Sequence, residues 1–166
     1  MRHKDTLVRV LFVCMGNICR SPMAEALFRH HVRQRGLEHH FLVDSAGTGS
    51  WHVGEPPHRG TQRVLDRHQV DWTGLEARQV SAAELQGWDM VIVMDDDNYR
   101  SLMSLSPKYP ERIRRMLDFH PQAPFQGVPD PYATGHFDEV YDLLNTATKA
   151  LVDYLVKEYA IEDPDA

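Results

Sequence analysis

The residues best suited to covalent chemistry lie together in one short segment near the N-terminus. The segment reads Cys14-Met15-Gly16-Asn17-Ile18-Cys19-Arg20-Ser21, with five residues between the first cysteine and the arginine. A loop in front of a helix N-terminus can direct its backbone N–H groups at one tetrahedral anion, so residues Met15 to Ser21 are expected to bind phosphate. Gly16 would supply the positive φ that such a loop requires. The planar Arg20 guanidinium would hold two phosphate oxygens.

Cys14 is the candidate nucleophile of this loop. A cation about 4 Å from a thiol favours the thiolate by ~4 kcal/mol at an effective dielectric of about 20. The helix dipole and the Ser21 hydroxyl add to that effect. Cys14 is therefore expected to be charged at neutral pH and to attack phosphorus without a separate base. The alternative, a small buried Cys14 beside a surface Arg20, is disfavoured because the spacing, the serine, the glycine and the flanking elements all coincide.

Asp130, in the segment Asp130-Pro131-Tyr132, is the candidate general acid. Attack of a thiolate on a phosphate ester leaves an alkoxide or phenoxide that must be protonated, and general-acid help is worth about 10²–10⁴ in rate. The proline-rich loop that holds Asp130 could present its carboxyl group over the phosphate-binding loop. On the residues alone, an isolated Asp-Pro pair also fits a plain turn.

Two other uses of such a loop are disfavoured by residue spacing. The chain has no G-x-x-x-x-G-K-[ST] run, so a nucleoside triphosphate site is not expected. Cys14 and Cys19 on one tight loop cannot spread as zinc ligands in Cys-x2-Cys pairs do, and the ten histidines show no matching pattern. The chemistry is therefore expected to need no metal and no cofactor.

Hydrophobic patterning predicts the scaffold that positions these residues. Strands are expected at 7–13, 41–43, 90–94 and 113–117, with a further short strand at 77–80. Long helices are expected at 21–35, 58–68, 95–104 and 137–155. Ser21 is expected to cap the first helix, with Pro22 at its first position and Gly36 after its end. Ser81 and Glu84 form a capping box for a brief helix, and residues 121–135 are expected to be loop.

This order of elements predicts an α/β fold of three layers. A parallel sheet of about four strands is expected, with helices on both faces and the phosphate-binding loop after the first strand. Ligands in such folds bind at the carboxyl ends of the strands. The loops after Val13, Val43 and Met94 are therefore the candidates for the site.

Length and composition indicate one globular domain. The 166 residues are 42% hydrophobic and 25% charged, and the formal net charge of −6 disfavours binding to nucleic acid or to an anionic membrane. Residues 1–166 are expected to form a single domain with frayed tails at 1–6 and 160–166. Two cysteines are too few for a disulfide scaffold and point to a reducing, cytoplasmic compartment. Arg9 interrupts the apolar run at 7–14, which fits a strand better than a secretory signal or an inserted segment.

Together these residues resemble the low-molecular-weight protein tyrosine phosphatase family over about residues 7 to 155. The specific combination is Cys-x5-Arg-Ser continuing into Pro22-Met23-Ala24-Glu25-Ala26, with Asp130-Pro131-Tyr132 near the end. The resemblance implies hydrolysis of phosphotyrosine, an aryl phosphate monoester, in protein substrates, with inorganic phosphate as a product. It implies that Cys14 forms a phosphocysteine and that Arg20 binds the phosphoryl oxygens. Asp130 would protonate the leaving phenol and later activate water.

The resemblance also implies roles for residues around the nucleophile. The expected hydrogen-bond network that holds the loop consists of Asn17, Ser21 and Ser45. The expected walls of the substrate slot are Met15, Ile18, Trp51 and Tyr132. Because Cys19 lies close to a reactive thiolate, it is expected to protect Cys14 through a reversible disulfide.

Two positions depart from the family's pattern. Leu75 stands where a histidine often completes the network, so the loop is expected to rely on its remaining polar residues or on water. Ala133 replaces the second tyrosine of the family's Asp-Pro-Tyr-Tyr, which leaves Tyr132 alone.

Three other functions share features of this loop. Protein-arginine phosphatases tend to have threonine at the position of Ile18, so the isoleucine favours phosphotyrosine. Arsenate reductases need further redox cysteines downstream, and none follows Cys19. A non-catalytic phosphate-binding module would be suggested by the loss of Cys14 or Asp130, and both are present.

Overall fold

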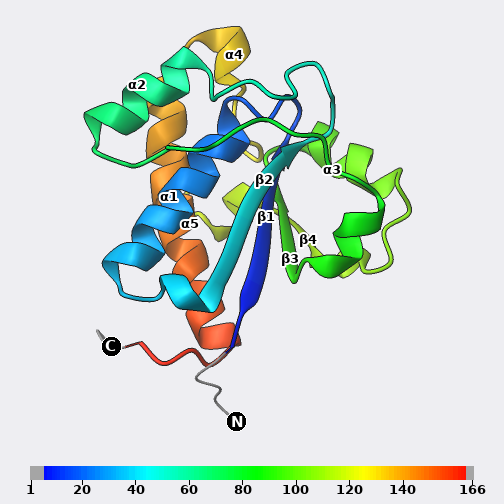
Figure 1. The fold of residues 1–166 in the computed structure, drawn as a ribbon, viewed down its shortest axis with the longest axis vertical. Helices are drawn as coiled ribbons and strands as arrows, with labels where there is room; N and C mark the ends of the chain where they lie inside the picture. Colours follow the sequence, from blue (N-terminus) through cyan, green and yellow to red (C-terminus); the bar gives the residue numbers. More distant parts are fainter. Residues whose placement is uncertain (1–5, 164–166) are drawn as a thin grey trace.

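A four-stranded parallel sheet forms the centre of the molecule (Figure 1). The computed structural model describes residues 6–163. The sheet order is β2-β1-β3-β4, and every pairing is parallel. The strands are β1 (Val8–Cys14), β2 (Phe41–Gly47), β3 (Met90–Val93) and β4 (Ile113–Arg115). The prediction of a four-stranded parallel sheet is confirmed.

Strand β1 lies between β2 and β3, and all its side chains except Arg9 are buried. Val10 and Phe12 belong to the larger apolar cluster, and the alternate residues Leu11 and Val13 belong to a second one. Strand β2 runs four residues past its predicted end and places Gly47 beside Cys14. The two strands therefore end side by side, and the loops that follow them meet at one edge of the sheet.

Helices cover both faces, as predicted (Figure 1). On one face α1 (Arg20–Gln34) packs against α5 (Phe137–Glu158), and α2 (Arg59–Arg67) contacts α5. On the other face α3 (Asp96–Met103) packs on β3 and β4. Short 3₁₀ helices complete the chain at η1 (Glu38–His40), η2 (Ala83–Gly87), η3 (Pro110–Arg112) and η4 (Met116–Phe119). The prediction of three layers is confirmed.

The first helix begins two residues earlier than predicted, with Cys19 and not Ser21 at the N-cap position. Helix α1 begins at Arg20 after Cys19, with no side-chain cap, because the Ser21 hydroxyl contacts the Cys14 sulfur instead. The predicted end is confirmed, since Gly36 follows the helix with a φ of 69°.

The predicted segments after Ala77 differ from the structure in four places. The strand predicted at 113–117 ends at Arg115, because residues 116 and 117 begin the 3₁₀ helix η4. Residues 77–80 form no strand, only an isolated bridge between Gly47 and Gln79. The capping box is formed, because the Ser81 N–H donates to the Glu84 carboxylate at 2.8 Å, but the helix it opens is the 3₁₀ helix η2. The loop predicted at 121–135 contains the short helix α4 (Pro131–Thr134).

Part of the predicted tails lies outside the described residues, namely 1–5 and 164–166. Within the described part, Ile161 is buried in the larger apolar cluster, and Asp163 forms an ion pair with Arg35. The ordered chain therefore extends past residue 160. Among residues 6–163, no helix combines the length and the apolar character that crossing a membrane requires.

Candidate active site

The loop between β1 and α1 wraps around the Cys14 sulfur. The backbone N–H of Asn17 donates to Cys14 Sγ at 3.3 Å. Asn17 adopts the left-handed conformation, with a φ of 57°, whereas the positive φ was predicted at Gly16. Asparagine tolerates this conformation better than most side chains. At Gly16 a Cβ would lie 3.1 Å from the His52 ring, a tight contact that the ring would have to relieve by a small shift.

A chain of hydrogen bonds runs from the Cys14 sulfur into the protein interior. Cys14 Sγ lies 3.0 Å from Ser21 Oγ, which accepts from Asn17 Nδ2 at 2.7 Å. The second Asn17 amide hydrogen goes to Ser45 Oγ at 3.0 Å. Ser45 Oγ in turn donates to Glu25 Oε1 at 2.7 Å. Because Ser21 Oγ accepts from Asn17, its own hydrogen is free to point at the sulfur and stabilise a thiolate.

Glu25 is a member of this chain that sequence reasoning missed. Its side chain is buried on α1, and Arg29 on the next turn pairs with it at 2.7 Å. Burial raises the pKa of the Glu25 carboxyl, and the Ser45 hydroxyl and Arg29 oppose that rise. A carboxylate in the middle of the buried face of α1, four residues from an arginine, was the available signal.

Asn17 keeps a full set of hydrogen-bond partners although Leu75 stands where a histidine was expected. The Asn17 amide oxygen accepts a hydrogen bond from the backbone N–H of Arg78 at 3.0 Å, while Leu75 packs against the larger apolar cluster. The Arg78 side chain is held between Asp44 and Glu84. The segment between α2 and η2 therefore supplies by its backbone the partner that a histidine side chain was expected to supply.

Arg20 is buried beside the loop and is held in place from two directions. Its Nη1 donates to Asp95 Oδ2 at 2.6 Å and to the carbonyl of Val128 at 3.0 Å. From the sequence, Asp95 was expected only as the first residue of the helix predicted at 95–104. It caps α3 with one oxygen, which accepts from the Asn98 N–H at 2.8 Å, and anchors Arg20 with the other. The Arg20–Asp95 pair was not visible in the sequence because 75 positions separate its members.

Asp130 lies on the far side of Arg20, at the start of α4. Its Oδ1 accepts from the Tyr132 N–H at 3.1 Å, and its Oδ2 lies 3.9 Å from Arg20 Nη2. Pro131 occupies the first helical position and fixes the backbone there. The helix cap thus uses one carboxylate oxygen and leaves the other directed at the phosphate-binding loop.

These elements enclose a slot of about 220 Å³ above the Cys14 sulfur. All of the predicted catalytic and wall residues line it together: Cys14, Arg20, Asp130, Met15, Ile18, Trp51 and Tyr132. Trp51, 71% exposed, stands at the mouth, and Met15 and Tyr132 are also exposed there. His52 lines the slot as well, and nothing in its sequence position had indicated this.

Cys19 also lines the slot but differs from Cys14 in its environment. Burial, and next the charge of Cys14, raise the pKa of the Cys19 thiol to about 12. Both cysteines are free. Cys19 is therefore a protonated thiol next to the candidate nucleophile.

The comparisons with known proteins agree with this geometry. Residues 9–161 match the model of the family described as low molecular weight phosphotyrosine protein phosphatase. The chain is 47% identical to the low molecular weight protein-tyrosine-phosphatase YfkJ of Bacillus subtilis, over 92% of this chain and 98% of that protein. The crystal structure of YfkJ superposes with a TM-score of 0.91, covering 94% of this chain and 99% of the other. A protein tyrosine phosphatase from Entamoeba histolytica superposes with a TM-score of 0.86 at 33% identity, covering 91% and 98%.

Proposed function

The chain belongs to the low molecular weight phosphotyrosine protein phosphatase family, and from this premise we propose which of its residues carry out the reaction. It is a phosphoric monoester hydrolase that removes phosphate from phosphotyrosine in proteins through a phosphocysteine intermediate. We assign the nucleophile to Cys14, the binding of the phosphoryl oxygens to Arg20, and general acid and base catalysis to Asp130.

The convergence of three groups on one point supports this assignment most directly. The Cys14 sulfur is approached by the Asn17 N–H and by the Ser21 hydroxyl, which both stabilise a thiolate. Arg20 and Asp130 line the same slot as that sulfur. A phosphoryl group bound in the slot would therefore meet a nucleophile, a cation and an acid at once.

In the first step the Cys14 thiolate attacks phosphorus and forms the S–P bond. The bond between phosphorus and the phenolic oxygen breaks, and the Asp130 carboxyl gives its proton to that oxygen. Arg20 and the backbone N–H groups of the loop hold the phosphoryl oxygens as charge spreads over them. The phenol leaves and the phosphoryl group stays on sulfur.

In the second step a water molecule attacks the same phosphorus. The Asp130 carboxylate takes a proton from this water, the S–P bond breaks, and the thiolate is restored. Inorganic phosphate leaves the loop. The Ser21 hydroxyl stabilises the thiolate both as nucleophile and as leaving group, because it is 3.0 Å from the sulfur.

The walls of the slot favour an aromatic ring between the protein surface and the phosphate. Trp51 and Tyr132 flank the opening, and Ile18 adds an apolar contact below them. A phosphoserine side chain is too short to reach the sulfur past these walls. Ile18, where threonine is typical of protein-arginine phosphatases, gives no hydroxyl to a guanidinium.

We also propose the setting in which the enzyme works. The two free thiols suit a reducing compartment such as the cytoplasm. Residues 1–166 are assigned to one catalytic domain, and the substrates are tyrosine-phosphorylated proteins.

A comparison of rates on matched peptides tests the proposed function. Peptides of one sequence carrying phosphotyrosine, phosphoserine or phosphoarginine would be hydrolysed with EDTA present, and arsenate reduction would be measured in parallel. We expect turnover of phosphotyrosine alone, undiminished by EDTA. Faster hydrolysis of phosphoarginine, or loss of activity in EDTA, would contradict the assignment.

A further inference from the structure

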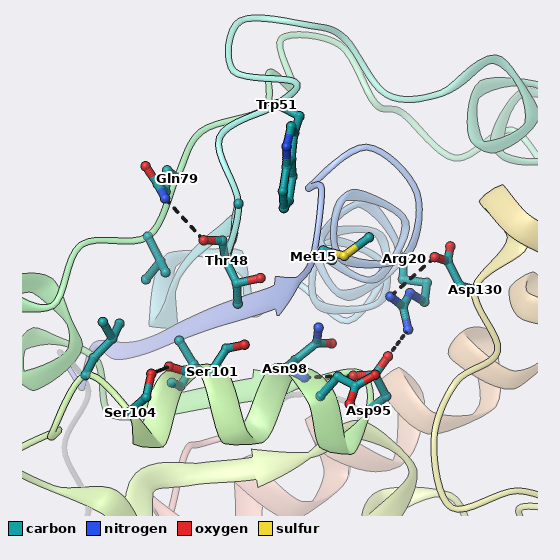
Figure 2. Close-up of a pocket in the computed structure, with 15 residues that line it drawn as sticks. Met15, Arg20, Thr48, Trp51, Gln79, Asp95, Asn98, Ser101, Ser104 and Asp130 are labelled. Atoms are coloured by element: carbon teal, nitrogen blue, oxygen red, sulfur yellow. Dashed lines mark hydrogen bonds and ion pairs between the residues drawn. The ribbon is translucent and has the colours of Figure 1, made fainter.

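A second cavity, of about 540 Å³, opens beside the slot (Figure 2). The two share Met15, Arg20, Trp51 and Asp130 among their lining residues. Figure 2 shows Arg20 and Asp130 at one end of this cavity and Ser104 at the other, with α3 along its floor and Trp51 above it. The cavity is therefore a groove, here called the α3 groove, that leads away from the catalytic slot.

The length of the α3 groove suits a peptide. Lining residues run along α3 from Asp95 to Leu105. Ten residues at the helical rise correspond to about 15 Å, and an extended chain covers that length with about four or five residues. The catalytic end of the groove is where a bound phosphotyrosine would join the rest of its protein.

The walls of the groove combine apolar contacts with hydrogen-bonding groups. Trp51, Val80 and Leu105 provide apolar surface. The polar lining residues are Thr48, Gln79, Asn98, Ser101 and Ser104. Such a mixture fits a polypeptide, whose backbone N–H and C=O groups need partners, better than it fits a purely apolar ligand.

The charges in the lining are mostly negative. Asp95, Asp97 and Asp130 line the groove, whereas its sole lining cation among the described residues is Arg20. Arg20 is held by Asp95 and lies at the catalytic end. Asp97 is exposed on the first turn of α3, and its ion-pair partner Arg100 does not line the groove. Asp97 is therefore the lining carboxylate outside the catalytic residues that a basic side chain of a bound peptide can reach.

We infer that the α3 groove binds the polypeptide segment on one side of the phosphotyrosine and selects lysine or arginine there. Long basic side chains would lay their methylene groups against Trp51 and Leu105 and place their charge near Asp97. Acidic side chains at the same place would be repelled by Asp97. This inference rests on the proposed function, because it assigns a specificity groove to the same active site.

The test compares peptides that differ only in the charge next to phosphotyrosine. Two lysines, two alanines or two glutamates would be placed before the phosphotyrosine in one series and after it in another. At low ionic strength we expect kcat/KM to be about threefold to tenfold higher for lysine than for glutamate, in one series only. The difference is expected to shrink in high salt.

Three variants that each raise the net charge by one localise the effect. Asp97→Asn removes a carboxylate from the groove, and Ser101→Lys places an ammonium one helical turn from Asp97. Glu158→Gln changes α5 at its C-terminal end, away from the groove, and serves as the control. We expect the ratio of kcat/KM for the lysine peptide over the glutamate peptide to fall in the first two variants and to stay constant in the third.

Three outcomes would overturn the inference. They are a wild-type ratio near one, an equal response in both peptide series, and an equal fall of the ratio in all three variants. Free phosphotyrosine is too small to occupy the groove, so its turnover by the wild-type enzyme tests the proposed function separately. If the wild-type enzyme hydrolyses free phosphotyrosine but shows no preference between the peptides, the inference about the α3 groove is wrong and the proposed function stands.

Discussion

The two carboxylate oxygens of Asp130 make different contacts. One caps α4, and the other lies 3.9 Å from Arg20 Nη2. Asp130→Asn keeps the cap, since asparagine is an equally good capping residue, but it removes the transferable proton. We expect kcat on phosphotyrosine to fall by about 10²–10⁴. The loss should be much smaller on p-nitrophenyl phosphate, whose leaving group needs little protonation, and equal losses on both substrates would refute the acid role.

We propose that Cys19 forms a disulfide with Cys14 when the nucleophile is oxidised. Peroxide would convert the Cys14 thiolate to a sulfenic acid, and the Cys19 thiol would displace water from it to form a disulfide. We expect dithiothreitol to restore most of the activity of the peroxide-treated enzyme. The matched variant Cys19→Ser should retain basal turnover within a few fold and recover poorly. If both proteins recover the same fraction of their activity, Cys19 does not protect Cys14.

Residue roles that follow from local pattern could be predicted, and those that depend on distant partners could not. Cys14, Arg20 and Ser21 lie in one segment whose spacing indicates the chemistry. Asp95 holds Arg20 from 75 positions away, which no local pattern reveals. The position of Glu25 on the buried face of α1 was a local signal, but its partner Ser45, 20 positions away, was not visible. Ser21 was expected to cap a helix because capping preferences do not consider other partners of the hydroxyl. In the structure the Ser21 hydroxyl contacts the Cys14 sulfur.

At the scale of elements, Asp95 ties the end of β3 and the start of α3 to the active site. Asp95→Asn should preserve the cap of α3 while weakening the hold on Arg20. We expect kcat/KM to drop by about tenfold with little change in Tm. Asp95→Ala should lower both quantities, and Asp96→Asn, which removes only an exposed pair with Arg115, should lower neither substantially. A large Tm loss in Asp95→Asn would show a merely structural role.

The long periodic elements were predictable from the sequence, whereas the short helix α4 was not. The apolar run of β1 and the apolar stripe of α5 each extend over several repeats, so their type follows from periodicity. Helix α4 has only four residues and depends on Asp130 as its cap and Gly135 in the left-handed region at its end. Its sequence reads as a turn because nothing in it is periodic.

For the whole molecule, the buried His31 predicts a loss of stability in mild acid. Burial, followed by the charges of Lys149 and His30, lowers the pKa of His31 to about 4, while Asn145 opposes this by hydrogen bonding. Because the unfolded chain binds a proton near pH 6.5 and the folded chain does not, the stabilising contribution of neutral His31 is complete above about 6.5. It is lost progressively as the pH falls toward 4.

Urea unfolding at pH 7 and pH 5 measures this effect. We expect the wild-type protein to lose about 1–2 kcal/mol of its unfolding free energy between these pH values through His31. His31→Leu should lose less over the same interval, whereas the exposed control His136→Gln should behave as the wild type. Parallel pH dependence in all three proteins would exclude His31 as the cause.

The covalent intermediate on Cys14 is the most direct test of the proposed catalytic chemistry. Asp130→Asn, which slows attack by water, would be mixed with p-nitrophenyl phosphate, whose leaving group needs little protonation, so that formation of the intermediate stays fast. The protein would be quenched by denaturation within milliseconds and mapped by mass spectrometry. We predict one phosphoryl group on the peptide that contains Cys14 and none in a Cys14→Ser protein, which should also lack turnover. A phosphoryl group on another residue, or undiminished hydrolysis by Cys14→Ser, would contradict the mechanism.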